Sequence, residues 1–216
     1  MTLTGPSRPA ASGNATSHVI FLHGYGADGA DLLGLAEPLA PYLLDTAFFA
    51  PNAPERSSLN PMGYQWFPIP RMDGSTEAQA VAGMQASAAV LNGWLDGLIA
   101  ESGVGAARTV LVGFSQGTMI SLEVAPRRAE AFAGVVGFSG RLVTPERLAG
   151  EVVSRPPILL IHGDMDDVVP PSSLPEAADA LVEAGFSVQT HISPGMAHGI
   201  AQDGLGLALG FIRDNL

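Results

Sequence analysis

The pentapeptide Gly113-Phe114-Ser115-Gln116-Gly117 constrains the fold of this 216-residue chain more than any other feature, because of the segments on either side of it. The aliphatic and β-branched run at 108–112 predicts a buried strand, and residues 118–125 predict a short helix that Pro126 stops. A Gly-x-Ser-x-Gly sequence on a strand-to-helix corner is typical of the nucleophile elbow of serine hydrolases. Glycine at both ends of the pentapeptide avoids collisions with neighbouring backbone in so tight a turn. Glycine-rich loops also match this pattern by chance. The interpretation of Ser115 as a nucleophile therefore depends on finding its catalytic partners elsewhere in the chain.

Predicted strands alternate with predicted helices along most of the chain. The clearest helix, 77–101, has one apolar stripe with spacings of three and four residues. The alternation predicts an α/β fold with a mostly parallel sheet covered by helices on both faces. In such sheets the functional loops gather beyond the carboxyl ends of the strands. We expect strands at 18–22, 46–50, 108–112, 132–138, 157–161 and 186–192, and helices at 31–39, 77–101, 118–125, 172–184 and from 198 onward.

No composition shift or long polar linker divides the chain, so we expect a single domain over residues 18–216. Residues 1–17 are rich in Ser, Thr, Gly, Pro and Ala and are expected to form a flexible arm or an edge strand. Residues 51–76 contain many turn signals and no helical period. They predict a long irregular loop, and loops of that length are usually functional.

The composition excludes several classes of function. The formal net charge is −11, and such a surface repels phosphate backbones, so we expect no nucleic-acid partner. The absence of cysteine removes disulfides, thiolate nucleophiles and cysteine metal sites, and it favours a reducing compartment. Residues 1–17 show no signal-peptide pattern, and no run of about 18 apolar residues occurs. We therefore expect a cytoplasmic protein without a membrane span.

The polar residues that follow the elbow occur in the order that acyl-transfer chemistry requires. A serine hydroxyl becomes a useful nucleophile when an imidazole takes its proton, and the imidazole needs a carboxylate partner. In α/β-hydrolases the chain order is serine, acid, histidine. Here Ser115 is followed by an acidic loop with Asp164, Asp166 and Asp167, and then by His198, the only one of the five histidines after the last predicted strand. A calcium loop is the alternative for the aspartates, but the EF-hand spacing with its distal glutamate is missing.

The negative oxygen of a tetrahedral intermediate needs preorganised N–H donors. We expect one from the backbone of Gln116 and the other from Tyr25, in the loop after the first strand. The same loop, at 24–29, matches the G-x-G-x-x-G dinucleotide fingerprint. However, Asp28 and Asp31 would put negative charge where the pyrophosphate should bind, and no acidic residue closes the second strand. We therefore expect no nucleotide cofactor.

Taken together, these motifs resemble the phospholipase/carboxylesterase family of α/β-hydrolases, which includes bacterial carboxylesterases and acyl-protein thioesterases. The resemblance covers the chain from Ser17 onward, and the set of motifs in this order is specific although each piece alone is not. The segments that carry it are Phe21 to Gly26, Ala50 to Pro54, Trp66-Phe67, Gly113 to Gly117, His162 to Asp166 with Val169-Pro170, and Gly195 to His198.

The resemblance implies an α/β-hydrolase fold without a separate cap domain, and a reaction that needs no metal and no cofactor. The family's acid falls on Asp166, and its oxyanion donors fall on Gln116 and on Tyr25, where many members have leucine. The substrate cleft is implied to be open and shallow. The residues implied to line it are Gly24, Trp66 and Phe67, with ordinary core packing as the alternative for the last two.

The expected function is therefore a serine carboxylesterase that hydrolyses short- to medium-chain acyl esters through an acyl-Ser115 intermediate. An acyl thioesterase or a lysophospholipase with the same triad is the nearer alternative, and a non-catalytic binding module on a hydrolase fold is the remote one. The expected partner is a small-molecule ester. The sequence leaves the oligomeric state open, with a homodimer among the options.

Overall fold

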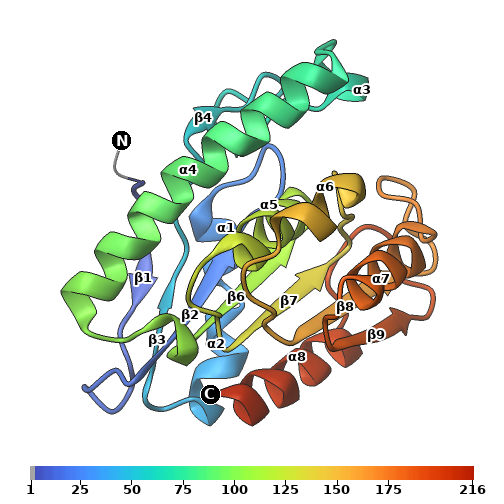
Figure 1. The fold of residues 1–216 in the computed structure, drawn as a ribbon. Helices are drawn as coiled ribbons and strands as arrows, with labels where there is room; N and C mark the ends of the chain where they lie inside the picture. The colour runs from blue at the N-terminus through green and yellow to red at the C-terminus, as the bar shows by residue number, and fades with distance from the viewer. Residues whose placement is uncertain (1–2) are drawn as a thin grey trace.

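A computed structural model describes residues 3–216, in which seven strands form one sheet flanked by helices (Figure 1). The strand order is β1-β3-β2-β6-β7-β8-β9; β1 is antiparallel to β3, and every other pairing is parallel. The strands of the sheet are β1 (Ser7–Arg8), β2 (Ser17–Leu22), β3 (Thr46–Phe49), β6 (Thr109–Phe114), β7 (Gly134–Phe138), β8 (Ile158–Gly163) and β9 (Val188–Ser193). The helices are α1 (Gly29–Leu33), α2 (Ala36–Leu39), α3 (Pro70–Asp73), α4 (Glu77–Ser102), α5 (Gln116–Val124), α6 (Pro145–Glu151), α7 (Ser173–Glu183) and α8 (Gln202–Asn215). The predicted mostly parallel sheet is confirmed.

Two hydrophobic layers, one on each face of the sheet, arise from the alternation of side chains along the strands. On β2, Ile20 and Leu22 belong to the layer that includes α4, α5 and α7. Val19 and Phe21, one residue out of phase, belong to the layer that includes α1, α2 and α8. Because each interior strand is buried on both faces, its sequence is continuously apolar rather than alternating.

Helix α4 is the longest helix of the described residues, and it extends beyond the sheet toward α3 and the short strand β4 (Glu55–Arg56) (Figure 1). It begins with a capping box, in which the Thr76 hydroxyl accepts from the Gln79 N–H while the Gln79 side chain accepts from the Thr76 N–H. It ends at Gly103, whose φ of 73° is left-handed. The predicted ends of the helix are confirmed to within a residue. The predicted stripe is buried or half-buried at Val81, Met84, Ala88, Leu91, Leu95 and Leu98.

Three sequence-based expectations about the elements are wrong in detail. The helix expected at 31–39 is two short helices, α1 and α2, separated at Gly34 and Leu35. The last helix begins at Gln202 rather than at His198, so that the histidine lies in the preceding loop. Segment 51–76 contains three short elements: α3 and a two-stranded antiparallel ladder of β4 (Glu55–Arg56) and β5 (Tyr64–Gln65).

His18 is buried because β2 lies between β3 and β6 in the sheet. Its ring packs edge-on against Phe49 at a centroid distance of 5.1 Å, and its Nδ1 has no hydrogen-bond partner within residues 3–216. Burial lowers the pKa of His18 below its ordinary value.

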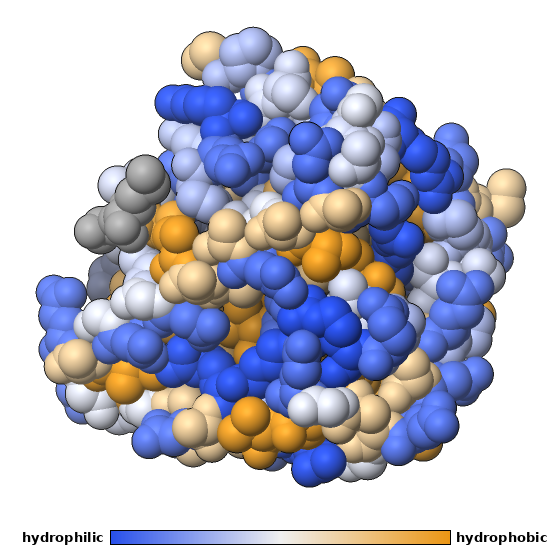
Figure 2. Space-filling view, turned by 45° about the horizontal axis from the view of Figure 1, so that its top comes forward, coloured by the Kyte–Doolittle hydropathy of each residue, from blue (hydrophilic) through white to orange (hydrophobic). Residues whose placement is uncertain are grey.

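Within residues 3–216, no helix combines the length and the apolar character needed to cross a bilayer. The face in Figure 2 is mainly hydrophilic, and its hydrophobic residues form separate patches rather than one continuous area.

Candidate active site

The turn between β6 and α5 holds Ser115 in a strained conformation, with φ 54° and ψ −114°. Glycine is required at 113 and 117: a Cβ on Gly117 would overlap the carbonyl group of Leu22, and one on Gly113 would overlap the backbone of Gly117 and Thr118. The Thr118 hydroxyl lies 2.9 Å from the Gly113 carbonyl oxygen and 2.8 Å from that of Phe138. The sheet and this hydroxyl together hold the turn in place, which is how a costly φ value persists.

His198 lies between Ser115 and Asp166. Its Nε2 is 3.0 Å from the Ser115 Oγ, and its Nδ1 is 2.8 Å from the Asp166 Oδ2. An ionised carboxylate can only accept, so Nδ1 carries the proton and Nε2 accepts from the serine hydroxyl. The Phe114 ring packs against the imidazole at 4.9 Å between centroids and helps to fix its orientation. The structure thus brings together the three predicted side chains, which are far apart in the chain.

Asp166 is the aspartate of the acidic loop that reaches the imidazole. Burial raises the pKa of its carboxyl, but the hydrogen bond from His198 and those from the Val168 and Val169 amides outweigh burial, and its pKa lies below the ordinary value. His162, which sequence reasoning did not single out, lies beneath this loop, with its Nε2 2.9 Å from the Val169 carbonyl oxygen. These hydrogen bonds therefore hold the carboxylate ionised and in place.

The other two aspartates of the loop have different surroundings. Asp164 accepts a 2.6 Å hydrogen bond from the Gly195 N–H, so it braces the loop that carries His198. Asp167 is exposed. Within residues 3–216, no group of three or more His, Cys, Asp or Glu side chains could hold a metal ion.

The loop after β2 lies directly against the nucleophile. A Cβ added to Gly24 would be 3.2 Å from the Phe114 ring and 3.4 Å from the Ser115 Cβ. In the described part of the chain, the backbone N–H groups of Tyr25 and Gln116 donate no hydrogen bond. The Tyr25 hydroxyl is 2.7 Å from the Ser58 Oγ, which ties this loop to segment 51–76. One of these N–H groups follows the nucleophile in sequence and the other follows Gly24, and N–H groups without a partner are the kind of donor that an oxyanion site requires.

His23 secures the same loop. Its Nδ1 lies 2.7 Å from the Gly24 carbonyl oxygen, and its Nε2 accepts from the Ala53 N–H at 3.0 Å. Burial lowers the pKa of His23, which keeps the ring neutral and suits one donor and one acceptor nitrogen. Both contacts hold the loop in place, so His23 acts as a positioning residue.

Trp66 and Phe67 do not share one role. Trp66 is fully buried, its Nε1 donates to the His23 carbonyl oxygen at 3.0 Å, and it does not line the cavity. The expectation that it contacts substrate is wrong, because the indole packs into the core beneath the loop. Phe67 does line the cavity beside Ser115.

The side chain of Gln116 connects the elbow to segment 51–76, a contact that sequence reasoning missed. Its Oε1 accepts from the Trp66 N–H at 2.8 Å, and its Nε2 donates to the Phe67 carbonyl oxygen at 2.6 Å. All three groups are buried. No local pattern could reveal this pairing, since the partners are about fifty residues apart.

A cavity of about 420 Å³ opens at Ser115 and His198. Its wall is mainly apolar, and it also contains two arginines and one glutamate. The residues that line it are Gly24, Tyr25, Ala27, Phe67, Pro68, Ile69, Pro70, Arg71, Met72, Glu77, Ala80, Phe114, Ser115, Met119, Arg141, Val143, Val168, Val169, Pro170 and His198. An apolar cavity with a few convergent polar groups is the usual form of a small-molecule site.

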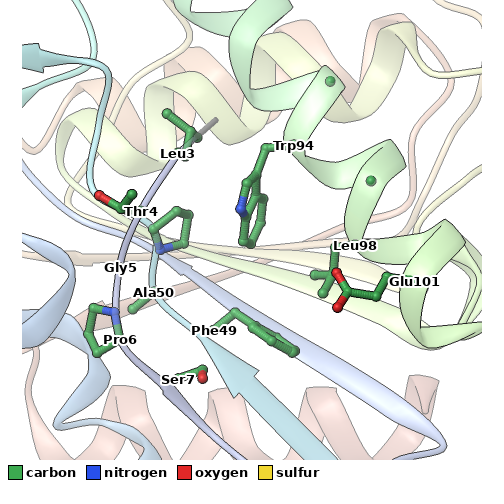
Figure 3. Close-up of a pocket in the computed structure, with 13 residues that line it drawn as sticks. Leu3, Thr4, Gly5, Pro6, Ser7, Phe49, Ala50, Trp94, Leu98 and Glu101 are labelled. Atoms are coloured by element: carbon green, nitrogen blue, oxygen red, sulfur yellow. The ribbon is translucent and has the colours of Figure 1, made fainter. Parts of the chain in front are cut away.

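A larger cavity, of about 580 Å³, lies at the edge of the sheet formed by β1 and β3, between the N-terminal segment, β3 and α4. Trp94, Leu98 and Glu101 of α4 face Phe49 and residues 3–7 across it (Figure 3). Glu101 is the only charged residue among those that line it. No histidine lines it to activate a hydroxyl group, so this larger cavity lacks the chemistry found at Ser115.

Comparisons with known proteins agree with this geometry. The model of the family described as phospholipase/carboxylesterase matches residues 9–216. The chain is 31% identical over 216 residues to acyl-protein thioesterase 1 of Neurospora crassa, covering 93% of this chain and 87% of that protein. It is 29% identical over 196 residues to esterase YpfH of Escherichia coli, covering 90% and 81%. The crystal structure of esterase PE8 covers all of both chains at 45% identity and a TM-score of 0.95, which confirms the α/β-hydrolase fold.

Proposed function

The chain belongs to the phospholipase/carboxylesterase family and is a carboxylic ester hydrolase, and we propose that it is a serine carboxylesterase acting through Ser115, His198 and Asp166. The observation that carries the proposal is the continuous hydrogen-bonded path from the Ser115 hydroxyl through His198 to the Asp166 carboxylate. This path supplies a nucleophile, a base and a group that stabilises the charged base.

In the proposed reaction, the Ser115 oxygen attacks the ester carbonyl carbon while His198 Nε2 takes the hydroxyl proton. The oxyanion of the tetrahedral intermediate accepts hydrogen bonds from the N–H groups of Gln116 and Tyr25. His198 then gives the proton to the leaving alcohol, and an acyl-Ser115 ester remains. Water, deprotonated by His198 Nε2, attacks the acyl carbon of this ester. The bond to the Ser115 oxygen then breaks, the acid leaves, and His198 returns the proton to the Ser115 oxygen.

The wall of the cavity supports acyl chains of short to medium length as substrates. Phe67, Met119, Val143 and Val169 provide an apolar surface next to the nucleophile. A thioester or a lysophospholipid has the same reacting carbonyl group, so thioesterase and lysophospholipase activity are the second candidate. The Neurospora relative's name, an acyl-protein thioesterase, favours including a thioester in the test.

Substitution of the nucleophile tests the proposal. Ser115→Ala should lower kcat/KM for a chromogenic acyl ester by about 10³-fold or more, since no other group on this path can form the acyl intermediate. A fluorophosphonate probe should label the wild-type chain at Ser115, which mass spectrometry of the labelled peptide can check. Near-wild-type turnover by Ser115→Ala would rule out the mechanism. Hydrolysis measured in parallel for oxygen esters and thioesters across acyl lengths separates the two substrate classes.

A further inference from the structure

Two arginines form part of the boundary between the active-site cavity and a neighbouring one. Arg71 and Arg141 line the cavity that contains Ser115, and both also line an adjacent cavity of about 240 Å³. Pro170, in the loop after Asp166, is the third residue that the two cavities share. A substrate that extends from Ser115 toward the second cavity would therefore pass both arginines.

The two arginines come from distant parts of the chain, and neither is used in the fold's own ion pairs. Arg71 lies on α3, and Arg141 lies in the loop after β7. Within residues 3–216, neither forms a salt bridge or a side-chain hydrogen bond. By contrast, Arg127 and Arg147 both form ion pairs with Glu123 and Glu151. Because Glu123 lies on α5 and Glu151 lies on α6, these ion pairs connect the two helices.

The wall of the active-site cavity has two basic residues and one acidic residue, whereas the two walls taken together have equal numbers of basic and acidic residues. Each cavity has one acidic residue in its wall, Glu77 in the active-site cavity and Glu176 in its neighbour, against the same two arginines. Asp73, two residues after Arg71 on α3, already accepts from the backbone N–H groups of Ile69 and Ser75. The chain has a net charge of −11 and only 10 basic residues. Two arginines without an ion pair within residues 3–216 therefore give the wall of the active-site cavity a charge balance opposite to that of the whole chain.

We propose that Arg71 and Arg141 select esters that carry a second, ionised acid group, either a carboxylate or a phosphate. The planar guanidinium group matches both of these oxyanions with paired N–H donors. The proposal rests on the serine esterase function proposed above and adds the substrate class to it. The apolar wall would hold the acyl part, and the arginines would hold the anionic end away from the reacting carbonyl.

The test compares matched esters that differ only in charge. Purified full-length protein is assayed with a neutral ester, a carboxylate-bearing ester and a phosphate-bearing ester of similar length, with the charge placed first in the acyl part and then in the alcohol part. The measured quantity is the ratio of kcat/KM for each anionic ester to that for the neutral ester. We expect a ratio above one for wild type in at least one series.

Arg71→Gln and Arg141→Gln should each lower this ratio by about fivefold, and the double variant by about twentyfold, the range that exposed ion pairs allow. Raising the salt concentration should lower the wild-type ratio as well. Arg213→Gln, which removes the same charge from an exposed position on α8, is the control and should leave the ratio unchanged. Circular dichroism checks that each variant is folded.

Two results would overturn the proposal: a wild-type ratio below one in every series, or an equal loss in the Arg213→Gln control, which would make the effect one of overall charge. These outcomes are distinct from failure of the esterase function. Hydrolysis of the neutral ester that disappears in Ser115→Ala keeps the proposed function in place even if the arginine variants show no selectivity.

Discussion

At the scale of single residues, the site depends on which aspartate faces the imidazole. Asp166→Asn should lower kcat by about 10³- to 10⁴-fold, because an amide can donate to His198 Nδ1 and so favour the tautomer that cannot take the serine proton. Asp164→Asn keeps an oxygen that can accept from the Gly195 N–H, so kcat should stay within about threefold of wild type. Steady-state kinetics on one chromogenic ester gives both values. The reverse pattern would move the acid to Asp164.

The residues of the site differ in how much of their role could be predicted from the sequence. Ser115 follows from the elbow pattern, which is local, and His198 follows from its place after the last predicted strand of an α/β fold. The choice of Asp166 among three aspartates came from resemblance, because the chemistry of the residues alone did not separate them. The roles of Arg71 and Arg141 were not predicted, as two arginines 70 residues apart in the sequence give no sign that they line one boundary.

At the scale of elements, the elbow and segment 51–76 are coupled through the Gln116 side chain. Gln116→Ala would leave the Trp66 N–H and the Phe67 carbonyl buried without partners, at a cost of about 2 to 4 kcal/mol in the free energy of unfolding. The backbone N–H of residue 116 is retained, so the variant separates the brace from the proposed oxyanion donor. We also expect a higher KM, because Phe67 lines the cavity.

Urea unfolding and ester kinetics measure the two effects in Gln116→Ala. Gln202→Ala, at an exposed position on α8, is the matched control and should change the free energy of unfolding by less than about 0.5 kcal/mol. If Gln116→Ala were no less stable than this control, the two hydrogen bonds would not join the segments as described.

Elements whose signals are local could be predicted well from the sequence, and those set by tertiary packing could not. The ends of α4 depend on Thr76 and Gly103, which act within one turn of the helix. The short elements within 51–76 depend instead on contacts with distant groups, such as the bond between the Asn60 side chain and the Gly26 carbonyl oxygen. The late start of α8 leaves His198 in a loop, where its ring can reach both partners.

At the scale of the whole molecule, two buried histidines link stability to pH. Burial lowers the pKa of His18 and of His23 in the folded state, whereas in the unfolded chain each titrates near 6.5. Below that pH the unfolded chain binds more protons than the folded one. The free energy of unfolding is therefore largest above the unfolded pKa and falls as the pH drops through about 6.5, by up to about 1.4 kcal/mol per pH unit for each group.

His18→Phe isolates one of these contributions. His18 lies against Phe49, and its Nδ1 makes no hydrogen bond within residues 3–216, so an aromatic ring without a titrating nitrogen should be accommodated there. Urea unfolding at pH 8 reports the packing change alone, because the wild-type histidine is neutral in both states. Between pH 7 and pH 5.5 the variant should lose stability less steeply than wild type. Parallel curves for the two proteins would contradict this argument, since they would mean that His18 binds its proton equally in the folded and the unfolded chain.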